Sequence, residues 1–461
     1  MSSPIQFAVA SDEGRSNNAN GSRLINFFAE TLPPTSKNVA VLYGTPGQKS
    51  FVTLPTAPVK AMIEMNGLLY AITATKLYSV TSAGVITLIN SVTMAGSVSI
   101  ASNGVHIAFV DGIKGYYYSI AGGLHEFTGA GWYASTTVTC QDGYFIFNRT
   151  GTGQFFFTGI LATTLDALDY ATAEASPDNT LAIISDQSSL WIFGESSIEI
   201  WYNDGVTPWA RMHGAYIERG IGAPYSIVKM DTSLFFIGNN GVVYRTSGYS
   251  LNRVSNHAIE YEFLRGNISN AYAYSYTQEG HIFYVLTIPD INRTCVYDTA
   301  TSLWHERSHS VEGRHDARCY VKCYDKHLIG NYSTGAITSL DMTAYDDNGV
   351  VIVREAVAPV VNKNRSRLTM YEFELDVMFE VQTESTTGIT GSPKVTLYWS
   401  DNDCRTWSTG RDRLISPVTG VLKTVRWQAL GQFVQRHIKI KTSDVGPITI
   451  AGAYTIISND N

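Results

Sequence analysis

Residues 61–73 read AMIEMNGLLYAIT: an apolar stretch, a tight Asn-Gly turn and a second apolar stretch. Asn-Gly is a strong hairpin signal because the favoured two-residue turns need positive φ at both central residues. The pattern recurs six times, with turns at Asn103, Asp142, Asp186, Asp231, Glu279 and Asp325. From the first turn, at Asn66, to the last, the mean spacing is about 43 residues. A unit of 40–45 residues with about four strands is typical of a β-propeller blade.

Each unit continues into a second hairpin, such as KLYSVTSAGVITLI at 76–89. The composition also favours an all-β protein, because 39 Gly, 27 Tyr and 19 Phe suit turns and pleated, half-buried surfaces. Only LATTLDALDYATAEA, at 161–175, has the composition of a helix.

The predicted architecture is a β-propeller of about seven blades with additions at both ends. Residues 1–58 are expected to form an extended N-terminal arm and the first strands, and 59–359 the propeller. VVNKNRSR at 360–367 is interpreted as a linker. Short strands within 368–461 predict a C-terminal β-sandwich-like domain.

The stretch His305–His315, HERSHSVEGRH, raises the question of a zinc protease, because His-Glu-x-x-His on a helix places two imidazoles on one metal. Here the preceding residues predict a strand, on which His305 and His309 would stand about 13 Å apart. We therefore considered His305, Glu306, His309 and His315 as metal ligands and rejected them. The paired acids Asp346 and Asp347 are interpreted as turn formers.

A second motif, SDNDCRTW at 400–407, resembles the Asp-box turn of sialidases and other propellers, a folding element in which an acceptor closes the turn. It leaves open an alternative function, a glycan-binding or glycan-hydrolysing (sialidase-like) β-propeller. No catalytic constellation accompanies it, so no enzyme activity is predicted.

The five scattered cysteines favour reduced residues rather than a disulfide framework. No apolar run is long enough for a membrane span, and no cofactor motif is present. The net charge of −7 is uneven, because residues 362–461 carry 12 basic and 10 acidic residues and the rest carry 21 and 30. Such a chain is not expected to bind nucleic acid tightly, because that affinity comes mostly from cations on phosphate.

Four stretches resemble one family. They are SRLINFFAETLPPTSKNVAVLYGTPG, LDALDYATAEASPDN with LWIFGESSIEIWYNDG, IERGIGAPYSIVKMDTSLFFIGNNGVVYRTSGYSLNRVSNHAIE, and VRWQALGQFVQRHIKIKTSDVGPITIAGAYTII. They are similar to the packaged-DNA stabilisation proteins, or tail accessory factors, of short-tailed bacteriophages.

The resemblance implies a structural virion protein, assembled in the host cytoplasm, that forms the tail hub or nozzle below the portal-adaptor ring. It implies a homo-oligomer, expected as a hexamer, that extends the DNA channel, retains packaged DNA and seats a tail needle, fibres or tailspikes. DNA would pass through without specific contacts. Five basic residues are candidate contacts to the adaptor or the DNA: Arg365, Arg367, Arg436, Lys439 and Lys441.

Overall fold

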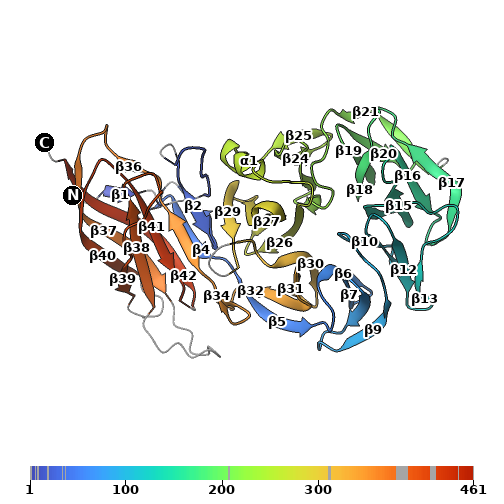
Figure 1. The fold of residues 1–461 in the computed structure, drawn as a ribbon, viewed down its shortest axis with the longest axis horizontal. Coiled ribbons are helices and arrows are strands. Elements are labelled where there is room, and N and C mark those ends of the chain that lie inside the picture. The colour runs from blue at the N-terminus through green and yellow to red at the C-terminus, as the bar shows by residue number, and fades with distance from the viewer. Residues whose placement is uncertain are drawn as a thin grey trace.

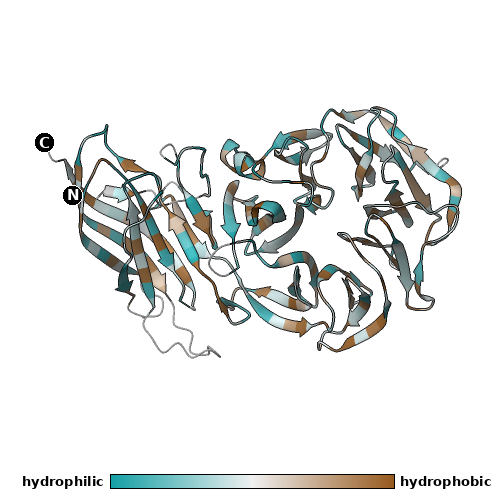
Figure 2. Ribbon diagram, viewed as in Figure 1, coloured by the Kyte–Doolittle hydropathy of each residue, from teal (hydrophilic) through white to brown (hydrophobic). Residues whose placement is uncertain are grey.

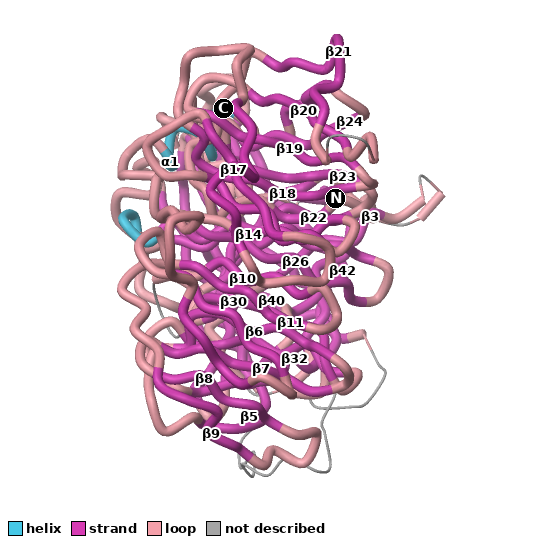
Figure 3. Tube along the Cα trace, turned by 90° about the vertical axis from the view of Figure 1, so that its right-hand side faces the viewer, coloured by secondary structure: helices cyan, strands magenta, loops and turns pink. Residues whose placement is uncertain are grey.

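Strands build nearly all of the fold in the computed structural model. It describes the chain except residues 1–2, 6, 8–9, 18–19, 34, 37, 206–207, 310–312, 380–392, 416–421, 445 and 460–461. Within the described residues, helix is limited to α1 (His257–Phe263) and the single 3-10 turn η1 (Pro289–Ile291), visible as short cyan segments in Figure 3. No helix in that part of the chain has the length and hydropathy to cross a membrane.

The seven hairpins predicted from the turn pattern are confirmed. Each joins the first two strands of a blade, and its turn contains residues with positive φ, such as Asn66 (55°) and Gly67 (77°). Where glycine is absent, Asp231 and Thr232 adopt the same conformation, at 47° and 55°. The backbone geometry of the turn is therefore kept even where its preferred residues are not.

Seven four-stranded antiparallel sheets form the propeller ring, on the right of Figure 1. Blade 1 comprises β6 (Val59–Met65), β7 (Leu68–Thr73), β8 (Lys76–Val80) and β9 (Ile86–Ser91). Blade 2 comprises β10 (Ser99–Ser102), β11 (His106–Val110), β12 (Gly115–Ser119) and β13 (Gly123–Glu126). Blade 3 comprises β14 (Val138–Gln141), β15 (Tyr144–Asn148), β16 (Gln154–Thr158) and β17 (Leu165–Thr172).

The remaining blades follow in chain order. Blade 4 comprises β18 (Thr180–Asp186), β19 (Ser189–Gly194), β20 (Ile198–Tyr202) and β21 (Ala210–Ile217). Blade 5 comprises β22 (Val228–Met230), β23 (Ser233–Ile237), β24 (Val243–Ser247) and β25 (Ser250–Arg253). Blade 6 comprises β26 (Tyr272–Gln278), β27 (His281–Ile288), β28 (Arg293–Asp298) and β29 (Leu303–Arg307). Blade 7 begins with β30 (Ala317–Cys323), β31 (Lys326–Asn331) and β32 (Ala336–Asp341).

Blade 7 takes its fourth strand from the other end of the chain. β5 (Gly47–Thr53) pairs antiparallel with β32, from Thr53 opposite Ala336 to Gly47 opposite Asp341. A short hairpin, β33 (Asp346–Asp347) and β34 (Val350–Val351), extends this sheet. The segment before blade 1 thus closes the ring.

Hydrophobic side chains fill each interface between neighbouring blades. Seven separate clusters of buried residues correspond to the seven interfaces, including the one between blade 7 and blade 1, where Leu328 and Ile337 pack with Val59 and Leu69. Burial of this apolar surface, worth about 25 cal/mol per Å², holds the blades together.

An eighth cluster is the core of a two-sheet sandwich, on the left of Figure 1. One sheet has the order β3 (Phe27–Thr31), β4 (Ala40–Gly44), β42 (Ile448–Asn459), β37 (Leu368–Phe379) and β40 (Lys423–Phe433), with β1 (Ser3–Ile5) also on β42. The other has the order β2 (Arg23–Ile25), β35 (Arg354–Val357), β41 (Gln435–Thr442), β38 (Lys394–Ser400) and β39 (Arg411–Leu414), with β36 (Val361–Asn362) also on β41. Hydrophobic and hydrophilic residues alternate along these strands, as Figure 2 shows.

A continuous sheet joins the sandwich to the propeller. Strand β2 pairs in parallel with β29, the outer strand of blade 6, and antiparallel with β35. The sheet of blade 6 therefore runs into the second sheet of the sandwich (Figure 1).

Three segments differ from the sequence expectations. Residues within 1–58 contribute β1 to β4 to the sandwich and β5 to blade 7, so the expected arm belongs to both units. The expected linker 360–367 contains β36, and β35 already lies in the sandwich. The helix expected at 161–175 is wrong: Leu165–Thr172 is β17, because Phe155, Phe156 and neighbouring residues of β16 offer it an antiparallel partner.

Candidate functional site

The His-Glu-x-x-His stretch lies on strand β29, as predicted, and runs into a loop. His305 is buried against Phe28 and Phe283, and burial lowers its pKa to about 3. Consecutive strand residues point to opposite faces, so Glu306 does not accompany it. The described residues contain no group of three His, Cys, Asp or Glu side chains placed to hold a metal ion.

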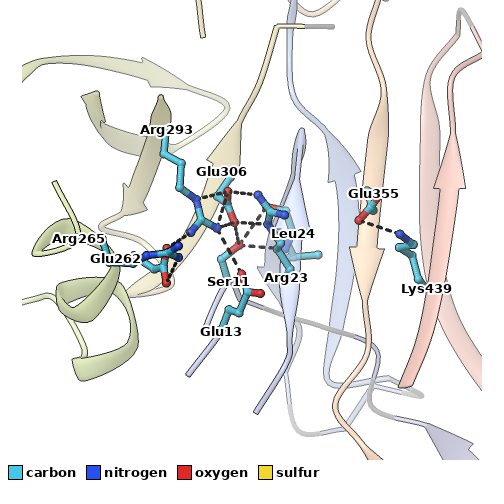
Figure 4. A network of polar contacts seen from close by, with 10 residues as sticks. All are labelled: Ser11, Glu13, Arg23, Leu24, Glu262, Arg265, Arg293, Glu306, Glu355 and Lys439. Carbon is cyan, nitrogen blue, oxygen red and sulfur yellow. Dashed lines mark hydrogen bonds and ion pairs between the residues drawn. The ribbon is translucent and has the colours of Figure 1, made fainter. Parts of the chain in front are cut away.

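Glu306 is instead the centre of a buried ion network between blade 6 and the sandwich (Figure 4). Arg23, on β2, donates two hydrogen bonds of 2.9 Å to its two carboxylate oxygens. Arg293, on β28, approaches from the other side and donates at 3.1–3.2 Å. Burial alone would raise the pKa of Glu306, but the two guanidinium groups outweigh it and hold this pKa at about 2.

Further contacts tie the N-terminal segment and α1 into the same network. Ser11 donates to the carbonyl of Leu24 at 3.1 Å or to Glu306 at 3.2 Å. Arg293 also donates to Glu262, on α1, at 2.7 Å. Arg293 and Glu306 lie on the neighbouring strands β28 and β29 of blade 6, whereas Arg23 comes from the distant strand β2. Their pairing therefore fixes where the N-terminal segment meets blade 6.

This network lines a cleft of about 780 Å³ between the two units. Charged side chains on its walls are Glu13, Arg23, Glu262, Arg265, Arg293, Glu306, Glu355, Lys439 and Lys441. Lys439 pairs with Glu355 at 3.6 Å and lies 4.2 Å from the centre of the Trp407 ring. Cys404 also lines the cleft, but burial raises the pKa of its thiol to about 11, so it is not an activated nucleophile.

The five predicted basic contacts do not form one patch. Arg365 and Arg367 are exposed at the turn before β37, whereas Lys439 and Lys441 face the cleft. Arg436 is only 2% exposed and is bound to Asp401 at 2.7 and 2.8 Å and to the Leu430 carbonyl at 2.7 Å. Its expected contact with adaptor or DNA is therefore corrected to a structural role.

A second cavity of about 470 Å³ lies on the propeller axis, lined by the inner strands of all seven blades. Tyr225, just before β22, reaches across it, and its hydroxyl donates to the carbonyl of Ser97 at 3.0 Å or of Thr136 at 3.1 Å. Arg318, on blade 7, donates a hydrogen bond to Ser97 Oγ at 2.7 Å. We call this cavity the tunnel. The contacts of Tyr225 and Arg318 close it at the end where the inner strands begin.

The Asp-box-like stretch is a turn between β38 and β39, as its pattern predicts. Asn402 Oδ1 accepts from the backbone N–H of Thr406 at 3.0 Å and so closes the turn. Cys404 replaces the usual glycine and adopts φ 62°.

The sequence analysis missed Arg23, Arg293 and Tyr225. A signal existed for the first two, because Glu306 stands in a buried strand and a buried carboxylate requires a cationic partner. Arg293 lies on the neighbouring strand of the same blade, but the contribution of Arg23 depends on the meeting of distant strands. Asp347, interpreted as a turn former, lies in the short hairpin of β33 and β34, but its side chain is buried, with only 4% exposed.

Comparisons with known proteins identify a relative. A family model described as bacteriophage P22 Gp10, beta-propeller, matches residues 20–345, well over half of the chain. No curated protein matches.

The solved structures that match are distant. The extracellular domain of the hybrid two-component system BT4673 from B. thetaiotaomicron is 8% identical with a TM-score of 0.45, over 71% of this chain and only 43% of that one. The N-terminal domain of Nup159 is 10% identical with a TM-score of 0.43, over 69% and 99%. BamB from Moraxella catarrhalis is 9% identical with a TM-score of 0.41, over 74% and 98%.

The strands of the seven blades, from Gly47 to Asp341, all lie within the matched residues. With the match over residues 20–345, these features place the chain in the phage stabilisation family of bacteriophage P22 Gp10.

Proposed function

We propose that this chain is a structural protein of a phage tail that forms a hub, or nozzle, below the portal-adaptor ring and retains the packaged DNA. It acts as a homo-oligomer, with six copies as the expected number, and seats a needle, fibres or tailspikes at its far end. Family membership supports the structural role.

The closed tunnel is the observation that carries the proposal of a ring of copies. The cavity of about 470 Å³ is spanned by a single tyrosine side chain, which reaches from blade 5 to residues beside blades 2 and 3. It is therefore too narrow for a DNA duplex, whose major groove alone is about 12 Å wide. Tyr225 also blocks one end. DNA therefore does not pass through a single propeller, and a channel in this assembly must lie between copies.

Rigidity supports the retaining role. A sheet shared by blade 6 and the sandwich, together with the Glu306 network, resists rotation of one unit against the other. Such resistance suits a hub that holds back a packaged genome.

The distribution of charge supports passage of DNA without tight binding. Most cations of the cleft, including Arg23, Arg293 and Lys439, pair with carboxylates. Paired cations release few counterions on contact with phosphate, so they add little affinity. Arg365 and Arg367 remain exposed and are the better candidates for contact with the adaptor.

Particles made with an early nonsense mutation in this gene test the proposal. Electron microscopy should find heads that package DNA and then lose it, with tails that end below the adaptor. Stable, filled, fully tailed particles that fail to bind or degrade host polysaccharide would instead support the glycan-active alternative.

A further inference from the structure

Positive charge is concentrated around the tunnel on the propeller axis. Among the described residues, Lys60, Lys229 and Arg318 line the tunnel, and no Asp or Glu side chain does. The whole chain, in contrast, has a net charge of −7. A cavity of about 470 Å³ has the size of a small-molecule site, because such sites range from about 300 to 1,000 Å³. The tunnel therefore has the charge and the volume to hold a small anion.

Two of these cations meet at the closed end of the tunnel. Nζ of Lys60 donates to the three carbonyls of residues 94–96 at 2.7–2.9 Å. Nη2 of Arg318 donates to Oγ of Ser97, the next residue of the same loop, at 2.7 Å. Burial, together with the like charge of Arg318, lowers the pKa of Lys60, although Asp111 acts against this. Two positive charges therefore lie close to each other beside one loop.

Arg318 is held in place but has donors to spare. Its guanidinium group lies 5.0 Å from the centre of the Tyr272 ring, and Ser97 is its only hydrogen-bond acceptor among the described residues. A guanidinium group carries five N–H donors. None of the nitrogen atoms of Arg318 is both buried and without a partner. The remaining donors are therefore accessible to a ligand in the tunnel that Arg318 lines.

Lys229, on β22, adds a third cation from blade 5. Its side chain is exposed, and its ammonium group forms no hydrogen bond or ion pair with the described residues. The surrounding protein still desolvates this group and lowers its pKa, although Asp186 acts against this. Exposure together with desolvation is the combination expected of a side chain inside a narrow tunnel.

The two nearest carboxylates do not neutralise the tunnel from within. Asp111 accepts from three backbone N–H groups at 2.7–3.0 Å, so its oxygens are used by the loops around it. Asp186 ends β18 and acts on Lys229 without forming an ion pair. Neither residue lines the tunnel. An anion in the tunnel would therefore offset like charges that the protein leaves close together.

A phosphate group matches this arrangement better than a carboxylate does. It carries a charge of about −1.5 to −2 at pH 7, so it can compensate more than one cation. Its oxygens can accept two parallel hydrogen bonds from one guanidinium group.

We propose that the tunnel binds a small molecule that carries a phosphate group. The phosphate accepts from the free donors of Arg318, and Lys60 and Lys229 add positive charge around it. The ligand is inorganic phosphate or a phosphate ester no larger than a mononucleotide. The site is separate from any passage for DNA, and the proposal does not depend on the role in the phage tail.

Isothermal titration calorimetry of the full chain tests the site with two probes, inorganic phosphate and adenosine monophosphate. The buffer contains no other polyvalent anion, and one molecule of probe should bind per chain. Tighter binding of adenosine monophosphate would identify an ester as the ligand, whereas equal or tighter binding of inorganic phosphate would identify the free ion. No binding of either probe at millimolar concentration would overturn the proposal.

Variants show whether the probe binds in the tunnel. Arg318→Met should weaken binding about tenfold or more, because charge-assisted hydrogen bonds to the phosphate are lost. Lys229→Met should also weaken binding, and it removes no contact within the fold, so it keeps the test decisive if Arg318→Met does not fold.

Arg245→Met is the matched control. Arg245 also donates to a serine hydroxyl, that of Ser233 at 3.1 Å, and lies 5.6 Å from the centre of the Phe235 ring, but it does not line the tunnel. Its replacement should leave the affinity unchanged. Unchanged affinity in Arg318→Met and Lys229→Met, or an equal loss in Arg245→Met, would place the bound probe elsewhere and overturn the proposal.

Discussion

Glu306 shows how much one residue contributes to the architecture. Its side chain is bound by arginines from β2 and β28, so a single carboxylate connects the N-terminal segment, blade 6 and the sandwich. Replacing such a partner is costly because the opposite charges stay buried and uncompensated.

We expect Glu306→Gln to lower the free energy of unfolding by about 3 kcal/mol at neutral pH. The folded-state pKa of about 2 lies below the ordinary value of 4.5, so the carboxylate stabilises the fold above about pH 4.5 and loses this effect as the pH falls toward 2. Between pH 5 and pH 3 the free energy of unfolding should therefore fall by about 2 kcal/mol more in the unmodified protein than in the variant. Urea unfolding at the two pH values measures this.

Glu355→Gln is the matched control, because Glu355 is half-buried and pairs with Lys439 at 3.6 Å. Its cost should stay below about 1 kcal/mol. Equal pH dependence in Glu306→Gln and the unmodified protein would contradict the assigned role of Glu306.

The hairpin turns allow a test of backbone conformation at the same scale. Thr232 is exposed and holds φ 55°, a conformation that costs energy for a β-branched residue. Thr232→Gly should stabilise the protein by roughly 0.5–1 kcal/mol. Gly280→Thr, at φ 85° in an open site of blade 6, should destabilise it by a similar amount. Thermal unfolding measures both, and shifts in the same direction would be inconsistent with this explanation.

At the scale of elements, local signals predicted the hairpins well and the long-range partners poorly. Asn66-Gly67 and its equivalents determine each turn through φ, which depends on the two residues themselves. The stretch at 161–175 has good helix formers, yet it is a strand because β16 lies beside it. Conversely α1 was not predicted, although Asn256 caps it by accepting from the N–H of Ile259.

Closure of the ring by β5 predicts a large effect of one cross-link. Thr53 lies directly opposite Ala336, so a disulfide in Thr53→Cys/Ala336→Cys would close a loop of nearly the whole propeller. In the chain-entropy model it should stabilise by about 4 kcal/mol more than Ser247→Cys/Ser250→Cys, which spans one hairpin of blade 5. The comparison is the melting temperature of each oxidised protein against its reduced form. An equal gain from both would argue against closure by β5.

The tunnel closure by Tyr225 gives a further prediction. Tyr225→Phe removes the hydrogen bond that the hydroxyl donates to the carbonyl of Ser97 or Thr136 and should cost about 1 kcal/mol. Tyr249→Phe, at a ring 48% exposed, is the control and should cost little. Urea unfolding of both variants decides the matter, and equal stability would mean that the Tyr225 hydroxyl does not hold the tunnel closed.

At the scale of the molecule, the repeat predicted the propeller, but the limits of the sandwich could not be read from order in the sequence. Its sheets combine residues before 45 with residues after 353, and only tertiary pairing reveals this. The partners of charged residues are likewise set by tertiary pairing. Arg436, on β41, was expected to be a free surface cation because its partner, Asp401, directly follows β38 and is 35 residues away in the sequence.

DNA retention by the intact particle is the most direct test of the central claim. Purified protein would be added to heads that were filled in its absence, and the DNase-resistant DNA per particle would be measured over time. The account predicts that the protein slows or stops the loss of DNA, and that a heat-denatured sample does not. Unchanged loss of DNA after the folded protein has bound the portal vertex would contradict it.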